Sequence, residues 1–106
     1  MKKLYGVTAA MITPFTENGR VDTESLAVLT DKLVKKGVHC LYPCGTTGEM
    51  VHLTENERKE IAETVVRAAD GRARVFIHCG AMRQEETESL LAHAFAAGAD
   101  GAGIVT

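Results

Sequence analysis

A unit of about 30 residues, the usual length of one βα repeat, recurs along this chain and ends each time in a glycine, at Gly37, Gly71 and Gly98. A helical pattern of apolar residues precedes each glycine, and a short apolar stretch typical of a buried strand follows it. Strands that alternate with helices at this length are typical of parallel α/β proteins. We therefore predict the order β-α-β-α-β-α-β, with about four parallel strands and three helices.

Local start and stop signals set the bounds of these elements. Asp22 is a good N-cap for the first helix, which Gly37 ends. Thr54 and Glu57 form a capping box at the start of the second helix, which Gly71 ends. The third helix runs from residue 84 to Gly98, and its apolar side carries Leu90, Leu91, Ala94 and Ala97. The predicted strands cover residues 5–13, 38–42, 74–78 and 101–106, and we expect the first to be buried on both faces.

The length and the last predicted element bear on domain organisation. A chain of 106 residues holds at most one domain. Its last predicted element is a strand with no helix after it, although parallel strands need cover on both faces and a bare end strand promotes association. We therefore expect residues 1–106 to be the N-terminal part of a longer single domain.

Charge and composition argue against several functions. The formal net charge of −2 gives no electrostatic case for binding nucleic acid or an anionic membrane. No apolar run approaches the length of a membrane span or of a signal-peptide core. The 3 cysteines show no metal-ligand spacing and fit buried thiols in a reducing cytoplasm. There is no GxGxxG, P-loop lysine or HExxH, so no cofactor or metal is expected.

The segment Gly45-Thr46-Thr47-Gly48-Glu49 is the richest candidate for a ligand site. Glycine allows positive φ and a close approach to a ligand, and successive N–H groups in such a turn form an anion-binding concavity. Threonine adds a hydroxyl that both donates and accepts. The segment follows the second predicted strand, and ligands of parallel α/β proteins bind at the carboxyl ends of strands. Two interpretations stay open: a pocket for a small carboxylate or phosphate, and an ordinary strand-to-helix turn.

Two residues at the end of the third predicted strand are weaker candidates. His78 could act as a base near neutral pH, but no acidic residue lies nearby in sequence, and we favour a polar residue that caps the core and bonds to backbone. Cys79, like Cys44, is expected to be a buried and inert thiol. The other histidines, His39, His52 and His93, form no metal set.

The lysines lie away from the predicted strands. Lys32, Lys35 and Lys36 belong to the first predicted helix and Lys59 to the second. A lysine that forms a Schiff base must be desolvated so that its amine is neutral and nucleophilic, which a surface helix does not provide.

Taken in order along the chain, several motifs resemble the start of the dihydrodipicolinate synthase and N-acetylneuraminate lyase family. They are residues 7–15 ending in Thr-Pro-Phe, Asp22, the Gly45–Glu49 segment, the Leu-Thr-x-x-Glu-Arg of residues 53–58, and the Gly-Ala-Asp-Gly of residues 98–101 leading to Val105 and Thr106. The resemblance implies part of a (β/α)8 TIM barrel. It also implies a class I, pyruvate-dependent aldolase or lyase that forms a Schiff base and is a homo-oligomer.

The resemblance also implies roles for the glycine-threonine segment. Thr46 and Thr47 would hold the carboxylate of pyruvate or a similar 2-oxo acid, and Thr46 would belong to a proton relay. Gly45 and Gly48 would permit the turn, and Glu49 would brace it.

The family's Schiff-base lysine and catalytic tyrosines lie on later strands, and neither Tyr5 nor Tyr42 matches their places. His78 and Cys79 stand where the family more often has small residues. We therefore expect the chain to carry the carboxylate-binding segment without the catalytic lysine and tyrosine. One alternative is a non-catalytic half-barrel that associates with itself or another chain. Another is a complete small doubly wound domain, which the missing glycine-rich first turn disfavours.

Overall fold

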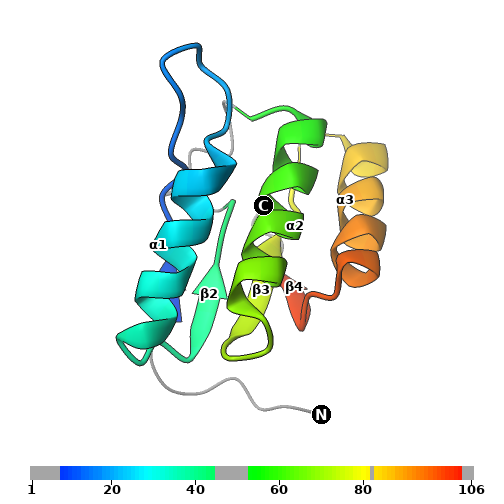
Figure 1. The fold of residues 1–106 in the computed structure, drawn as a ribbon. Coiled ribbons are helices and arrows are strands. Elements are labelled where there is room, and N and C mark those ends of the chain that lie inside the picture. Colours follow the sequence, from blue (N-terminus) through cyan, green and yellow to red (C-terminus); the bar gives the residue numbers. More distant parts are fainter. Residues whose placement is uncertain (1–7, 45–52, 82, 104–106) are drawn as a thin grey trace.

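The computed structural model describes residues 8–44, 53–81 and 83–103, and it confirms the predicted order of elements (Figure 1). Three helices follow three of the four strands in regular alternation. The elements are β1 (Thr8–Ala10), α1 (Thr23–Lys35), β2 (Cys40–Tyr42), α2 (Glu55–Ala69), β3 (Arg74–His78), α3 (Gln84–Ala97) and β4 (Gly101–Gly103).

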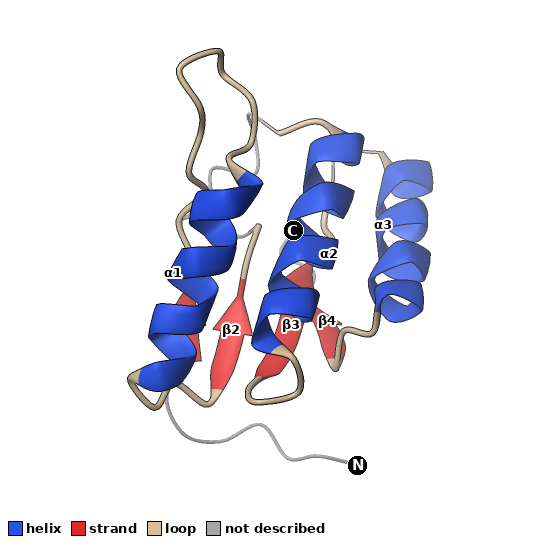
Figure 2. Cartoon of the chain, viewed as in Figure 1, coloured by secondary structure: helices blue, strands red, loops and turns tan. Residues whose placement is uncertain are grey.

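The four strands form one parallel sheet in the order β1-β2-β3-β4. Each connection carries one helix, and all the helices lie on the same face of the sheet, with α2 between α1 and α3 (Figure 2). This is the arrangement that right-handed crossovers between neighbouring parallel strands produce. Because the strands are parallel, their carboxyl ends meet at one edge of the sheet.

The core lies between the sheet and this helical layer. Leu41 on β2 and Val75 on β3 are partners in register, and both are buried, as is Ile77. From the helices, Leu26, Ile61, Val65, Leu90 and Ala94 complete the same cluster. Since successive side chains of a strand point to opposite faces, Tyr42, Phe76 and His78 belong to the face away from the helices.

Two hydrogen bonds between Asp100 and the backbone of Val75 stabilise the register between β3 and β4. Asp100 accepts a hydrogen bond from the Val75 backbone N–H through its carboxylate at 2.9 Å, and its own N–H donates to the Val75 carbonyl at 2.8 Å. Both backbone groups of Val75 are thereby satisfied at the start of β4, as buried backbone groups require.

The capping predictions for α1 and α2 are confirmed. Asp22 accepts from the Ser25 N–H at 3.0 Å. In the capping box the Thr54 hydroxyl accepts from the Glu57 N–H at 3.1 Å, and the Glu57 carboxylate accepts from the Thr54 N–H at 2.9 Å. The end of α2 differs by one residue from the prediction, because Asp70 already adopts the left-handed conformation (φ 48°) ahead of Gly71. Aspartate tolerates this conformation better than most residues.

The predicted burial of the first strand on both faces is wrong for β1. In β1, Thr8 and Ala10 are exposed while Ala9 is half-buried. Among the described strands β1 pairs only with β2, and the helices cover only one face of the sheet. The apolar run of the sequence therefore lacks cover on one side.

Candidate functional site

The carboxyl edge of the sheet is where the predicted ligand segment begins. β2 ends at Tyr42, and the chain continues through Pro43 and Cys44, both buried. Gly45, Thr46, Thr47, Gly48 and Glu49 lie outside the described residues, and their roles stay predictions. His52 and Tyr5 also lie outside.

The backbone that leads into this segment is held from both sides. The Tyr42 carbonyl accepts from the Met11 N–H at 3.2 Å, and the Pro43 carbonyl accepts from the His78 N–H at 3.3 Å. Cys44 has a positive φ of 66°, which is uncommon for a residue other than glycine. The chain thus turns sharply just before Gly45, at the place where ligands of parallel α/β proteins bind.

Arg58 also lies at the carboxyl edge of the sheet, and the sequence pattern gave it no role. It lies in the first turns of α2 with only 3% of its surface exposed, and its guanidinium donates to the His78 carbonyl at 2.8 Å. This bond ties the start of α2 to the end of β3. A signal was present in the sequence, since residue 58 lies three and four positions before Ile61 and Ala62, on the apolar side of the helix.

The side chains of Tyr42 and His78 contact each other at the same edge, on the face of the sheet away from the helices. The Tyr42 hydroxyl lies 3.0 Å from Nδ1 of His78, and the two rings are in an edge-on arrangement with centroids 6.1 Å apart. His78 is 1% exposed. The prediction of a core-capping histidine is therefore confirmed as to burial, and its ring also bonds to a tyrosine hydroxyl.

Burial lowers the pKa of His78, the positive charge of Arg58 lowers it further, and the Gly103 backbone opposes them. The ring is consequently uncharged in the neutral range. Burial also raises the pKa of the Tyr42 hydroxyl, so the pair is a neutral hydrogen bond.

This gives a pH prediction for stability. A histidine whose pKa is lowered by folding binds more protons in the unfolded chain, so its contribution is complete above the unfolded pKa of about 6.5 and is lost as pH falls below it. We expect the free energy of unfolding, measured by urea titration and circular dichroism, to fall from about pH 7 to about pH 5, by at most about 1.4 kcal/mol per pH unit. Hydrogen bonds lower the pKa of three exposed carboxylates, Asp22, Asp31 and Glu55. These groups change the free energy of unfolding at a lower pH than His78 does.

The control for this prediction is His78→Gln, which cannot titrate. Its unfolding free energy should lose most of the slope in that pH window. A slope as steep as that of the wild type would show that another group is responsible.

The cysteines Cys40, Cys44 and Cys79 are free and buried, as predicted. Burial raises the pKa of Cys44 to about 12, against a smaller opposing effect of Arg58, and it raises the pKa of Cys79 in the same direction. A thiol this far from ionisation is a poor nucleophile. The thiols therefore serve packing at this edge.

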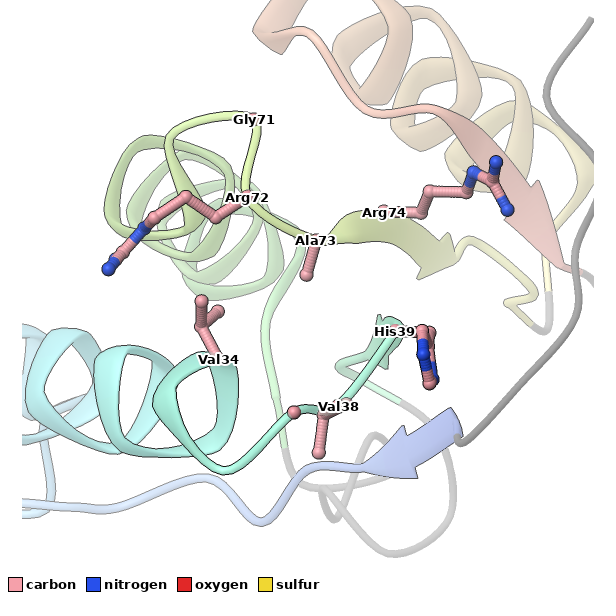
Figure 3. Close-up of a pocket in the computed structure, with 8 residues that line it drawn as sticks. Val34, Val38, His39, Gly71, Arg72, Ala73 and Arg74 are labelled. Carbon is pink, nitrogen blue, oxygen red and sulfur yellow. The ribbon is translucent and has the colours of Figure 1, made fainter.

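A separate hollow of about 390 Å³ lies at the other end of the sheet, around the amino ends of β2 and β3 (Figure 3). The side chains of Arg72 and Arg74 point away from each other there. Arg72 bonds to the carbonyls of Ala68 and Ala69 and pairs with Asp31 at 2.9 Å. Because ligands of such sheets bind at the opposite end, this hollow is not our candidate.

Within residues 8–44, 53–81 and 83–103, no group of three or more His, Cys, Asp or Glu side chains could hold a metal ion. No helix in these ranges has the length and apolar character that crossing a membrane requires.

Comparison with known proteins decides the family. The model of the dihydrodipicolinate synthetase family matches residues 3–106. The chain belongs to this family. It is 43% identical over 101 residues to 4-hydroxy-tetrahydrodipicolinate synthase of Magnetococcus marinus, covering 95% of this chain and 34% of the relative. It is 42% identical over 106 residues to human N-acetylneuraminate lyase, covering 98% of this chain and 33% of that enzyme.

Solved structures of the dihydrodipicolinate synthetase family give the same result for the fold. Dihydrodipicolinate synthase from Aquifex aeolicus matches with a TM-score of 0.91 at 40% identity, over 95% of this chain and 34% of that one. A prophage protein of E. coli K12, solved in complex with pyruvate, matches with a TM-score of 0.90 at 38% identity, over 93% and 33%. The four strands and three helices are thus part of a TIM barrel. The chain spans about a third of the length of these relatives and corresponds to their N-terminal portion.

Proposed function

We propose that this chain binds the carboxylate of pyruvate or a similar 2-oxo acid, as the N-terminal part of a Schiff-base-forming, pyruvate-dependent lyase or aldolase. The observation that carries the proposal is the match to a family member solved with pyruvate, at 38% identity over 93% of this chain. The site would lie at the carboxyl edge of the sheet, where residues 45–49 begin after the turn at Cys44.

The chemistry of residues 45–49 suits this role. A carboxylate has two oxygens that accept hydrogen bonds, and Thr47 offers both a hydroxyl and a backbone N–H. Thr46 would add a second hydroxyl and a step in proton transfer. Gly45 and Gly48 would let the backbone approach the ligand, and Glu49 would brace the turn.

The proposed reaction of the whole enzyme begins on the lysine that forms the Schiff base. No lysine of residues 1–106 lies in a predicted strand. Its amine would attack the keto carbon of pyruvate to give a carbinolamine, and loss of water would give an imine. Loss of a proton would give an enamine that adds to an aldehyde, and the reverse sequence would cleave the product. In the described part of the chain the lysines belong to α1, its C-cap and α2. Lys35 is largely exposed, and Lys59 is paired with Glu55 at 2.9 Å.

We therefore expect this 106-residue chain to bind pyruvate without forming a Schiff base. Pyruvate should shift NMR signals of residues 44–54 in a saturable way. Incubation with pyruvate and borohydride should leave the mass of the chain unchanged, since borohydride traps only an imine. Thr47→Val should abolish the saturable shifts, while the control Thr23→Val at the start of α1 should keep them. A reduced pyruvate adduct on the chain would contradict the claim that it lacks a competent lysine.

A second candidate function is self-association, as a half-barrel that pairs with another copy. It is favoured by the sheet edges, because within the described residues β1 and β4 each pair with one strand only. Unpaired strand edges are templates for further pairing. Light scattering should give a mass above that of one chain that rises with concentration, and a constant monomer mass at high concentration would refute this function. In either case we place the protein in the cytoplasm, where its free thiols would stay reduced.

A further inference from the structure

We infer that His78 is a positioning residue of the 2-oxo acid site, which holds the hydroxyl of Tyr42 in one place at the carboxyl edge of the sheet. The inference rests on the proposed function for the ligand, and on the described residues for the geometry. Neither residue belongs to the glycine-threonine segment.

The first step is the location of the pair. Tyr42 is the last residue of β2 and His78 the last of β3, so both stand at the edge where residues 45–49 begin. Both side chains lie on the sheet face away from the helices, which in a TIM barrel is the interior. Tyr42 precedes Gly45 by three residues and remains partly accessible, whereas His78 is buried.

The second step is the space that β4 leaves for the tyrosine. A Cβ atom built on Gly103 would lie 2.6 Å from the Tyr42 hydroxyl and 3.0 Å from its ring. Gly103 is the register partner of His78, so the tyrosine reaches across β3 toward β4. Three neighbouring strands thus contribute to one arrangement: β2 the hydroxyl, β3 its partner and β4 the space.

The third step is the state of the imidazole. Nδ1 is engaged by Tyr42, while Nε2 is buried and has no hydrogen-bond partner among the described residues. A buried polar atom without a partner is costly and is often found where a ligand or water completes the site. The groups that face the ring are the Tyr42 hydroxyl from β2, the Gly103 backbone from β4 and the cationic Arg58 from α2.

The neighbouring cation explains why an uncharged ring suits this place. The Arg58 guanidinium bonds to the His78 carbonyl, and a second positive charge beside it would be repelled. A neutral histidine offers a fixed hydrogen bond to the tyrosine without adding charge. The tyrosine hydroxyl is then held in one orientation before the ligand arrives, which lowers the cost of binding.

Two substitutions of His78 separate this role from simple packing. In His78→Asn the amide lies near the place of Nδ1 and can still bond to the tyrosine, whereas in His78→Gln it lies nearer the place of Nε2. We expect Tyr42→Phe and His78→Gln to weaken pyruvate binding by about fivefold to tenfold, the value of one lost hydrogen bond. His78→Asn should remain within about twofold of the wild type. The matched control His93→Gln, on α3, should bind as the wild type does.

A second measurement needs no ligand. The nitrogen NMR signals of the His78 ring should show one neutral tautomer near pH 7, and Tyr42→Phe should shift Nδ1 far more than Nε2. Gly103→Ala, which crowds the hydroxyl, should shift Nδ1 in the same direction while the ring of Tyr42 is retained.

The outcomes are distinguishable. If Asn and Gln at position 78 weaken binding equally, or if Tyr42→Phe leaves Nδ1 unchanged, the positioning role is wrong. If the wild type does not bind pyruvate, the proposed function fails, and the Nδ1 signal in Tyr42→Phe alone decides whether His78 holds the hydroxyl.

Discussion

Replacing Arg58 with alanine is expected to lower the free energy of unfolding by about 3 kcal/mol, because it removes a buried charge-assisted bond to a backbone carbonyl. Arg58 is 3% exposed, and its guanidinium donates to the His78 carbonyl at 2.8 Å. Among the described residues, Arg58 is the one side-chain donor to this carbonyl, and the alanine variant lacks that bond. Removal of the long arginine side chain also leaves a cavity. Urea unfolding followed by circular dichroism measures the loss.

Two further substitutions show whether the charge or the geometry matters. Arg58→Lys keeps the charge but loses the planar fork of donors, so it should fall between the wild type and the alanine variant. Arg67→Ala removes an exposed arginine from the last turn of the same helix and should cost less than about 0.5 kcal/mol. Equal unfolding midpoints for Arg58→Ala and Arg67→Ala would refute the role of Arg58 in joining α2 to β3.

Leu41→Ala should have an effect of similar size for a different reason. Leu41 is fully buried on β2, in register with Val75, and packs under the helices. Truncating a buried leucine costs about 2–5 kcal/mol through lost transfer energy and the cavity that remains. Because β2 leads into residues 45–49, the same variant should also weaken pyruvate binding.

The controls for Leu41 test the assignment of sheet faces. Val28→Ala, at a position 55% exposed on α1, should change stability by less than about 0.5 kcal/mol. Tyr42→Phe, one residue along β2 on the opposite face, should cost only about 1 kcal/mol, the value of one hydrogen bond. An effect of Tyr42→Phe as large as that of Leu41→Ala would mean that the two faces are misassigned.

Much of the fold could be predicted because its signals are local. The capping box of Thr54 and Glu57 and the N-cap Asp22 depend on residues three positions apart, and both form as expected. The bounds of β3 and the start of α3 at Gln84 also agree with the sequence pattern. Predictions were weaker where burial depends on distant cover, as at Thr8 and Ala10 of β1.

The site could be predicted only in part. The sequence placed a glycine-threonine segment after the second strand. In the structure β2 ends at Tyr42, three residues before this segment begins, as that prediction requires. It gave no role to Arg58 and set Tyr42 aside, since neither residue has a neighbour in sequence that reveals its partner. The sequence pattern of α2 marked position 58 as inward, but it could not show which carbonyl its charge would meet.

The sequence by itself determined the alternation of strands and helices, their caps and the family, because these rest on contacts and motifs within a few residues. Only the tertiary structure joined Tyr42 to His78 and Arg58 to the His78 carbonyl, across 36 and 20 residues of chain. Those contacts depend on strand register and on which face each side chain takes. A shift of one residue would send every side chain of a strand to the other face, so the pairing of Tyr42 with His78 is decided by the assembled sheet.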